Sequence, residues 1–495
     1  MAVEKYDTPT NPQESSDELC KKFERTLNLK AEQLIKSAIQ TNIFAEWEEK
    51  FLSCPKNKLA LSAVSNGDLS SIIYQRNAAI FDNNHVYSDK IDLEGSPVTY
   101  QRKSGRCWLF AVTNVIRVEF MKKFNLSEFE FSQGYLFFYD KLEKANCKSE
   151  YISLFRLIGI IDFLENILKT SEEPLDSRVV SFLLSEPIND GGQYDMVVNL
   201  LNKYGLVPKH VYPDAYNAKD SASLNRLIKT KLREYALILR SLVAKSATTT
   251  TISSFRAKMM EEIYVILAIS LGIPPKPDDE FTWLYVDKDN KVHSCKTTPL
   301  LFYKESSQFK GDEYISLIND PRNEYGRLYT VDMLSNMAGG IGVRYLNTKM
   351  ETLKEVAIKM IKKQQPIFFG ADSGKYIDRQ SGIFDTALFD YELAFNVKPN
   401  LTKGDRLRVG ESLMTHAMVI TAVHIEDGKP VKWRVQNSWG EDVGQKGWFM
   451  MTDEWMTEFV YQIVCHYSDL SEELQSVINQ VPIVLPPWDP MGSLA

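Results

Sequence analysis

Residues 101–111 read Gln101-Arg102-Lys103-Ser104-Gly105-Arg106-Cys107-Trp108-Leu109-Phe110-Ala111. Residues 103–105 are typical of a loop, whereas apolar series that begin at Trp108 and Leu109 recur at helical spacing. Cys107 therefore stands where a turn becomes a helix. Unpaired backbone N–H groups and the positive end of the helix dipole favour a thiolate there, and the thiolate is the nucleophilic form. Taken alone, however, a single cysteine is more often a buried structural residue.

Two later segments favour a catalytic interpretation. Thr415-His416-Ala417-Met418 opens an apolar strand, and Gln436-Asn437-Ser438-Trp439-Gly440 closes another. A cysteine, a histidine and an asparagine in this chain order are the components of a Cys-His-Asn hydrolase.

These motifs resemble the three active-site signatures of papain-like cysteine proteases. The matching patterns are Gln101-x5-Cys107-Trp108, His416 followed by a β run, and Asn437-Ser438-Trp439-Gly440. The resemblance covers most of the 495 residues, is weakest before about residue 60, and is strongest to a cytosolic branch of the family, whose C-terminal pattern residues 488–495 share. It implies a thiol aminopeptidase that needs no cofactor and hydrolyses N-terminal amide bonds of peptides and aminoacyl amides through an acyl-enzyme.

The resemblance implies a role for each catalytic residue. Cys107 is the expected nucleophile, and His416 takes its proton and later gives it to the leaving amine. Asn437 would hold the imidazole in the right tautomer, and Gln101 would donate a side-chain N–H to the oxyanion. His424 has the same strand parity as His416, so spacing alone leaves it as a rival; the resemblance favours His416.

Substrate binding is expected at a glycine turn and at the chain end. Asp190-Gly191-Gly192 resembles the family's Gly-Gly turn, where bare backbone pairs with an extended substrate, although a glycine pair by itself indicates only a turn. The apolar residues 483–488 predict a docked strand. In the branch that the chain resembles, the last residues enter the cleft, so the carboxylate of Ala495 would pair with a substrate's α-amino group. Without such an arm, the enzyme would be an endopeptidase.

The chain is expected to divide into five segments. They are an N-terminal arm (1–60), a helical half with the nucleophile (61–206), a helical insertion (207–310), a β half with the histidine and asparagine (311–470), and a C-terminal arm that enters the cleft (471–495). Cys107 and His416 are 309 residues apart, whereas ~130–150 residues separate them in papain-like enzymes. A helical half followed by a β half predicts an α+β protein with its cleft between the two halves.

Local periodicity predicts the individual elements. Helices are expected over 27–39, 44–51, 131–142 and 154–168, and two apolar stripes over 224–242 and 252–269 predict a helical hairpin that Gly272 ends. Residues 417–423 are apolar on both faces, which is typical of a central strand. Residues 431–436 alternate, which predicts a half-buried strand with Asn437 on the inward side.

Composition narrows the class of protein. Hydrophobic residues make up 44% of the chain, charged residues 25%, and the net charge is −7, as in ordinary globular proteins. No secretory signal is visible, and the longest apolar run, 263–273, is far shorter than the ~20 residues that span a bilayer. Six scattered cysteines show no metal-binding spacing. Secreted family members have a disulfide-forming cysteine where this chain has Ser104, so we expect a cytoplasmic protein.

One segment has a charge opposite to that of the chain. Residues 217–258 contain nine basic and two acidic side chains. The basic residues are Lys219, Arg226, Lys229, Lys231, Arg233, Arg240, Lys245, Arg256 and Lys258. A solvated helix face is the simpler interpretation, and a phosphate-binding surface is the alternative.

The resemblance extends to assembly. Relatives form hexameric rings and some bind nucleic acid nonspecifically, so the resemblance implies a homohexamer and leaves weak nucleic-acid binding open. The alternative from another class is a nucleic-acid-binding or scaffolding ring with incidental protease activity.

Overall fold

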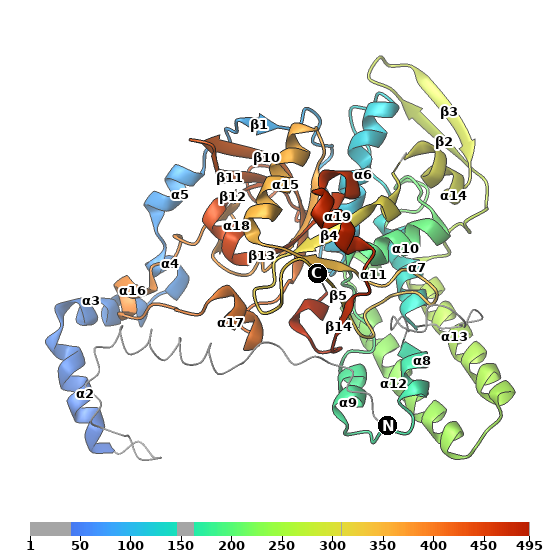
Figure 1. Ribbon diagram of the computed structural model, residues 1–495, viewed down its shortest axis with the longest axis horizontal. Helices are drawn as coiled ribbons and strands as arrows, with labels where there is room; N and C mark the ends of the chain where they lie inside the picture. Colours follow the sequence, from blue (N-terminus) through green and yellow to red (C-terminus); the bar gives the residue numbers. More distant parts are fainter. Residues whose placement is uncertain (1–40, 146–162, 308, 495) are drawn as a thin grey trace.

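The computed structural model describes residues 41–145, 163–307 and 309–494 (Figure 1). Cys20, Cys147, Ala495 and the helix expected over 27–39 lie outside these ranges, as does the first part of the helix expected over 154–168. Within the described ranges, no helix is both long enough and apolar enough to cross a membrane.

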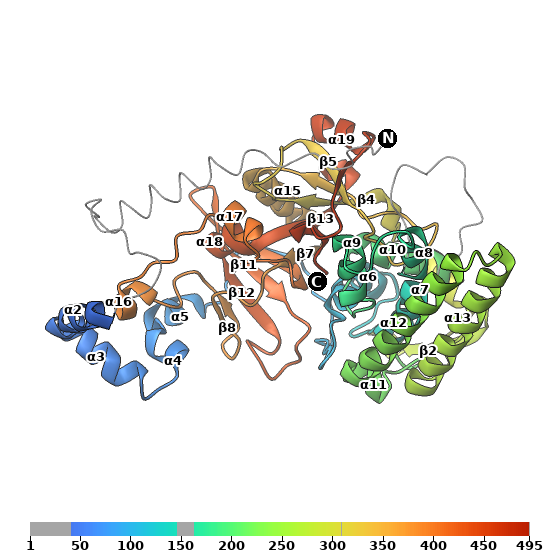
Figure 2. The same ribbon diagram turned by 90° about the horizontal axis from the view of Figure 1, so that it is seen from below.

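A helical half and a β half lie side by side (Figure 2). The helical half is built around α6 (Cys107–Lys123), whose side chains are buried on almost every face. A helix that is apolar all round belongs in a protein interior. The helices α7 (Gln133–Ala145) and α10 (Tyr194–Tyr204) pack against it, and α8 (Phe163–Lys169) and α9 (Arg178–Ser185) lie beyond them. The start of α6 and the position of α7 confirm two predictions.

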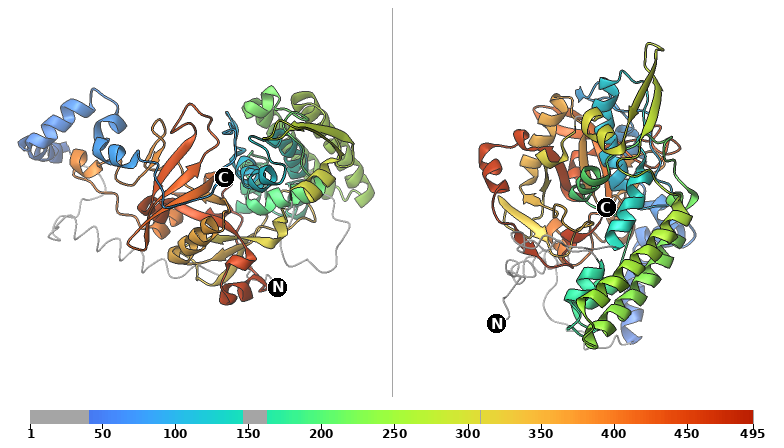
Figure 3. Two further views of the ribbon diagram at one scale, coloured as in Figure 1. Left: turned by 90° about the horizontal axis from the view of Figure 1, so that it is seen from above. Right: turned by 90° about the vertical axis from the view of Figure 1, so that its right-hand side faces the viewer.

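The predicted helical hairpin is confirmed. It consists of α12 (Ala222–Ala244) and α13 (Thr249–Leu271), which lie side by side at the edge of the helical half (Figure 3). The Thr248 hydroxyl accepts a hydrogen bond from the Thr251 backbone N–H and caps the second helix. Gly272 ends that helix with a φ of +86°, a conformation that favours glycine.

A two-stranded sheet follows the hairpin and was not predicted. Its strands, β2 (Phe281–Val286) and β3 (Val292–Thr297), pair antiparallel. Trp283 stacks on Tyr285, Tyr285 stacks on His293, and Trp283 also contacts Phe120 of α6. These strands owe their position to aromatic contacts with a helix about 160 residues earlier in the sequence, which local periodicity does not reveal.

The β half contains one twelve-stranded sheet in the order β14-β5-β6-β4-β13-β7-β10-β11-β12-β9-β8, with β1 paired to β10. The strands are β1 (Asp89–Lys90), β4 (Tyr314–Ile318), β5 (Arg327–Val331), β6 (Tyr345–Asn347), β7 (Ile367–Ala371), β8 (Ile377–Asp378), β9 (Ile383–Phe384), β10 (His416–Glu426), β11 (Lys429–Gln436), β12 (Trp448–Thr452), β13 (Val460–His466) and β14 (Ile483–Leu485). This sheet beside the helical half makes the protein α+β, as predicted.

The predicted central strand is β10, which lies between β7 and β11. Its residues alternate between two cores. Ala417 and Val419 belong to the core of the helical half, whereas Met418 and Ile420 belong to the core beneath α15 (Met350–Lys362). Both faces of β10 are therefore covered, which explains its continuous apolar run.

The prediction for β11 is wrong in its second half. Arg434 and Gln436 are buried, although alternation assigned them to the solvent side. The segments on both sides of β1 cover this face: the Arg434 guanidinium donates to the Glu94 carboxylate at 2.7 Å and to His85 Nδ1 at 3.0 Å. A distant segment thus supplies polar partners that make burial of a charged side chain possible.

The remaining helices lie at the periphery, and α2 and α3 extend away from the β half (Figure 1). They are α2 (Thr41–Ser53), α3 (Pro55–Val64), α4 (Leu69–Ile73), α5 (Arg76–Asp82), α11 (Tyr216–Lys219), α14 (Pro299–Leu301), α16 (Tyr391–Phe395), α17 (Lys403–Arg408), α18 (Asp453–Phe459) and α19 (Glu472–Ile478). The helix expected over 44–51 is contained in α2.

Candidate active site

The histidine and asparagine of the sequence motifs meet in the structure. The Asn437 side-chain oxygen lies 2.9 Å from His416 Nε2, and it also accepts the Ser438 backbone N–H at 2.8 Å. An oxygen acceptor at Nε2 holds the proton on that nitrogen and leaves Nδ1 unprotonated in the neutral ring. His416 is therefore oriented as a base through Nδ1.

An indole covers this hydrogen-bonded pair. The Trp439 ring stacks on the His416 ring with centroids 4.9 Å apart, and the Arg379 guanidinium lies 5.0 Å from the centre of the same indole. Asn437 is fully buried and His416 is nearly so. The stack keeps water from competing for the bond between His416 and Asn437.

Cys107 is the first residue of α6 and is buried beside the start of β10. Burial raises the pKa of its thiol to about 11, and hydrogen bonds from the backbone N–H groups of Ala417, Trp108 and Cys107 itself oppose that rise. The helix terminus thus acts in the predicted direction, but desolvation is the larger effect. Because Ala417 follows His416 directly, its bond to the sulfur brings Cys107 next to the histidine strand.

Burial also acts on the imidazole. It lowers the pKa of His416 to about 4, the hydrogen bond to Asn437 opposes that change, and the charge of Arg379 adds to it. Each group taken singly is therefore neutral at neutral pH. A proton that passed from the Cys107 sulfur to Nδ1 would leave the net charge of the site unchanged, and the two opposite charges would attract each other, which acts against the cost of burial.

Gln101 lies in the loop before α6 and contacts the asparagine segment. Its backbone N–H donates to the Ser438 carbonyl at 2.8 Å, and its side-chain oxygen accepts from the Ser438 hydroxyl at 2.6 Å. Its side-chain amide donates to the Ser104 carbonyl at 2.6 Å. These bonds hold the amide within the loop that leads to Cys107, and its second N–H remains for another acceptor.

The glycine turn packs directly against the helix that carries Cys107. A Cβ atom on Gly192 would come within 2.6 Å of the Trp108 indole, so only glycine fits there. The Lys144 ammonium donates to the Gly191 carbonyl at 2.6 Å. Gly192 is thus in contact with the residue that follows Cys107, while the substrate-binding role of Gly191 and Gly192 stays a prediction.

The C-terminal arm lies between the two halves of the molecule (Figures 2 and 3). Its strand β14 pairs with β5, which confirms the predicted docked strand. The Ser493 carbonyl accepts from Gln193 Nε2 at 2.8 Å, beside the glycine turn, and the Ser493 hydroxyl donates to the Met414 carbonyl at 2.9 Å, two residues before His416. The described end of the arm therefore connects the segment after the glycine turn with the segment before β10.

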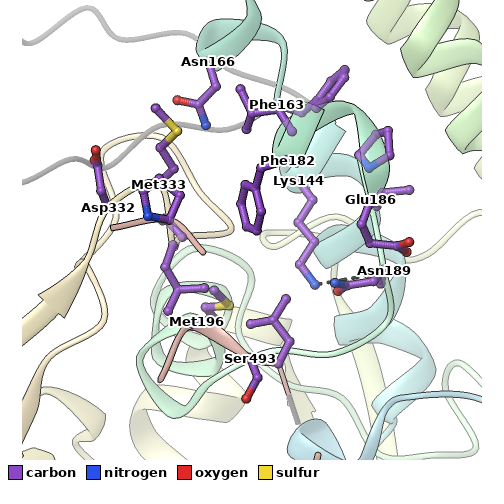
Figure 4. Close-up of a pocket in the computed structure, with 18 residues that line it drawn as sticks. Lys144, Phe163, Asn166, Phe182, Glu186, Asn189, Met196, Asp332, Met333 and Ser493 are labelled. Carbon is purple, nitrogen blue, oxygen red and sulfur yellow. Dashed lines mark hydrogen bonds between the residues drawn. The ribbon is translucent and has the colours of Figure 1, made fainter. Parts of the chain in front are cut away.

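A pocket of about 300 Å³ opens beside the arm (Figure 4). Ser493 lies at its edge, and Lys144 and Asn189 lie across from Met333. Its lining is mostly apolar.

The rival histidine is remote from this site. His424 lies eight residues along β10, roughly 26 Å for an extended strand, and its Nε2 bonds the Glu426 carboxylate at 3.1 Å. The structure thus brings His416, not His424, to Asn437. Among the described residues, no group of three His, Cys, Asp or Glu side chains is arranged to hold a metal ion.

Sequence reasoning missed two buried charges near Cys107. Arg106 is fully buried and makes a two-pronged ion pair with Asp214, at 2.8 and 3.1 Å. In the sequence Asp190 is recognisable only as part of the glycine turn, yet its carboxylate pairs with the buried Lys141 at 2.7 Å. No local sequence pattern indicates either pair, because Arg106 and Asp214 are 108 residues apart in sequence, and Lys141 and Asp190 are 49 residues apart.

The fold and this site define a papain-like cysteine peptidase. Residues 38–492 match the model of the Peptidase C1-like family, so the chain belongs to that family. It is 45% identical over 456 residues to bleomycin hydrolase of Mus musculus, covering 90% of this chain and 96% of that one, and 43% identical to bleomycin hydrolase of Homo sapiens, covering 93% and 99%. It is also 39% identical to cysteine proteinase 1, mitochondrial, of Saccharomyces cerevisiae, covering 98% and 99%.

A solved structure agrees. The crystal structure of PepW from Lactobacillus rhamnosis is 42% identical, covers 93% of this chain and 100% of its own, and superposes with a TM-score of 0.87. The chain is thus a papain-like cysteine aminopeptidase that resembles bleomycin hydrolases along nearly its whole length.

Proposed function

We propose that Cys107, His416, Asn437 and Gln101 hydrolyse the N-terminal amide bond of peptides and aminoacyl amides. The bond of His416 to Asn437 under the Trp439 ring carries the proposal, because it leaves Nδ1 as the base. The alternative of an incidental activity in a scaffold gives no reason for so carefully oriented an imidazole.

The proposed reaction has two stages. Nδ1 of His416 takes the Cys107 proton, and the thiolate attacks the substrate carbonyl, whose oxygen becomes negative beside the backbone N–H of Cys107 and the second side-chain N–H of Gln101. Collapse of this intermediate breaks the C–N bond, and the imidazolium protonates the leaving amine. His416 then takes a proton from water, the hydroxide attacks the thioester, and the amino acid leaves while Cys107 regains its proton.

The C-terminal arm is the proposed origin of the aminopeptidase preference. The contacts of Ser493 with Gln193 and with Met414 support an arm that closes one end of the cleft. In this proposal the carboxylate of Ala495 meets the substrate's α-amino group. A carboxylate there attracts an ammonium and leaves no room for an acetyl group.

A digest of one peptide in two forms tests this proposal. The peptide with a free N-terminus should be cleaved residue by residue, and its N-acetylated form should persist under the same conditions. Mass spectrometry follows both substrates. Cleavage within the acetylated form at a similar rate would favour the endopeptidase alternative.

Assembly as a homohexamer belongs to the same proposal, as does the division of the chain into five segments. Apolar side chains of α2 and α3 support an interface between copies, since Phe44, Trp47, Leu59 and Leu61 are 45 to 73% exposed. Exposed apolar surface of this kind marks protein–protein contacts.

Nucleic-acid binding by the basic segment 217–258 receives less support. Five of its nine basic side chains have protein partners: Lys229 pairs with Glu186, Lys231 with Glu234, and Arg256 with Glu165, while Arg233 and Arg240 donate to carbonyl oxygens. The exposed residues Lys219, Arg226, Lys245 and Lys258 are the better candidates for phosphate contacts.

A cytoplasmic location completes the proposal. Ser104 forms hydrogen bonds where secreted relatives have a disulfide, and the described cysteines (Cys54, Cys107, Cys295 and Cys465) are all free thiols, as suits a reducing compartment. Cell fractionation with antibody detection tests it, and enrichment of the protein with mitochondria, as the name of the yeast relative suggests for that protein, would contradict it.

A further inference from the structure

The Asp190 carboxylate joins three separate parts of the helical half. One oxygen accepts the Gly105 backbone N–H at 3.1 Å and the Ser221 hydroxyl. The other accepts Asn225 Nδ2 and the Lys141 ammonium, both at 2.7 Å. Gly105 belongs to the nucleophile loop, Ser221 and Asn225 to the N-terminal end of α12, and Lys141 to α7. Four donors saturate a carboxylate that has two oxygens.

The backbone around Asp190 is held just as firmly. The Trp108 indole N–H donates to the Asp190 carbonyl at 2.7 Å, and Lys141 also donates to the Asn189 carbonyl at 2.7 Å. Lys144, which pairs with Asp140 at 2.7 Å, donates to the Gly191 carbonyl. Two buried lysines of α7 thus hold the carbonyl groups of Asn189 and Gly191, on either side of Asp190.

We infer that Asp190 is a positioning residue, which locks the glycine turn to the loop before Cys107 and so fixes the distance between the bound substrate and the sulfur. The inference rests on the proposed role of Cys107. Secreted relatives hold this loop with a disulfide, which Ser104 excludes here. The Asp190 carboxylate would hold the loop instead, through hydrogen bonds and an ion pair that reducing agents do not break. Gly105 fits the same arrangement, because a Cβ atom there would lie 3.0 Å from the Asp190 Cβ.

The ionisation of Asp190 suits this role. Burial alone would raise its pKa, but the Lys141 charge and the hydrogen bonds of Lys141, Ser221 and Asn225 lower the pKa well below the ordinary value. A group with a depressed folded-state pKa stabilises the fold above its unfolded pKa and loses that contribution only as the pH falls through the folded value. The cross-link therefore persists at neutral and mildly acidic pH.

The test uses Asp190→Asn in the full chain. An asparagine keeps the size but offers one oxygen, and its NH₂ would face donors, so at least one of the four bonds is lost and Lys141 loses the carboxylate with which it pairs at 2.7 Å. We expect kcat on an aminoacyl amide to fall by about tenfold or more, because a small misplacement of reacting groups has large effects on rate. The rate of Cys107 alkylation by iodoacetamide should fall as well, and KM should change less than kcat.

Asp453→Asn is the matched control. Asp453 also pairs with a lysine, Lys354, at 2.5 Å and also accepts a tryptophan N–H, that of Trp433, at 3.1 Å, but it lies in the β half. Its variant should lower the melting temperature and leave kcat and the alkylation rate unchanged. Wild-type kcat and alkylation in Asp190→Asn would overturn the inference and leave Asp190 with a structural role alone.

A milder variant keeps the inference testable if Asp190→Asn does not fold. Asn225→Ala removes one bond to Asp190 and leaves the ion pair with Lys141 intact. It should reduce kcat and alkylation a few-fold, and unchanged values would overturn the inference. Alkylation reports on Cys107 without requiring turnover. Failure of the proposed function is recognised separately, by activity that survives in Cys107→Ala.

Discussion

At the residue scale, the chemistry depends on what surrounds one buried sulfur. Cys107→Ala should abolish hydrolysis of an aminoacyl amide, and His416→Ala should lower kcat by a factor on the order of 10⁴ or more, since both act in the same proton transfer. His424→Ala should have wild-type kcat, because His424 bonds Glu426 far along β10. Steady-state kinetics measure kcat of each variant, and melting curves show whether the variant is folded. Product formation by Cys107→Ala would refute the mechanism.

The pH dependence of alkylation separates the thiol from the thiol–imidazole pair. In the wild type, proton transfer to His416 should make Cys107 react with iodoacetamide at mildly acidic pH. That pH is below the pKa of a free cysteine, which is ~8.5. In His416→Ala that route is lost, and burial raises the pKa of the thiol, to about 11 in the intact site. The reaction of the variant should therefore be slow at neutral pH and accelerate as the pH rises.

Peptide mapping identifies which cysteine carries the label in this experiment. Cys295, which is partly exposed, is the natural internal comparison. Faster labelling of Cys295 than of Cys107 at mildly acidic pH would contradict the activation that we propose for the pair of Cys107 and His416.

At the scale of elements, the C-terminal arm can be removed without touching the catalytic residues. Deletion of residues 492–495 should open the cleft, lower activity on aminoacyl substrates and allow cleavage within N-acetylated peptides. The strand β14 and the ion pair of Asp489 with Arg322 at 2.8 Å would still hold the base of the arm. Comparative digests measured by mass spectrometry test the prediction.

Gln193→Ala offers a graded version of the same test. It removes only the hydrogen bond to the Ser493 carbonyl, so the arm should remain but be held less tightly. We expect a smaller loss of preference for free N-termini than in the truncated enzyme. A truncated enzyme with unaltered preference would show that the arm does not set specificity.

The basic segment 217–258 gives a second prediction at this scale. If it binds nucleic acid, affinity should fall steeply with salt, because each phosphate contact releases counterions. Replacing the exposed residues Lys219, Arg226, Lys245 and Lys258 with glutamate should then abolish binding and leave kcat unchanged. Fluorescence anisotropy with single-stranded DNA at several salt concentrations measures both effects. Binding that is unaffected by the four substitutions would return the segment to a solvated helix face.

At the scale of the whole molecule, the projecting helices α2 and α3 predict self-association. Analytical ultracentrifugation should find a species near six times the chain mass of 56.7 kDa. Trp47→Glu with Leu59→Glu introduces charges on 45% and 73% exposed apolar positions, and these should shift the distribution to smaller species. A wild-type protein that sediments as a monomer at micromolar concentration would contradict the hexamer.

The sequence by itself determined the class of chemistry and most local elements. The sequence predicted the motifs around Cys107, His416 and Asn437. It also predicted the α12–α13 hairpin with its end at Gly272, the central strand β10 and the docked strand β14. These features depend on residues that are only a few positions apart in the sequence: helical and strand periodicities, helix caps and short motifs. They can therefore be recognised without knowledge of the fold.

Only the tertiary structure decided which distant residues meet. It brought His416 into contact with Asn437, buried Arg434 against Glu94, built the β2–β3 sheet on Phe120, and joined Lys141 to Asp190 beside Gly105. It also reversed the net effect on the Cys107 thiol, because desolvation outweighs the helix terminus. The physical reason is common to all of them: burial and ion pairing depend on what packs around a group, and those neighbours come from chain segments tens to hundreds of residues away.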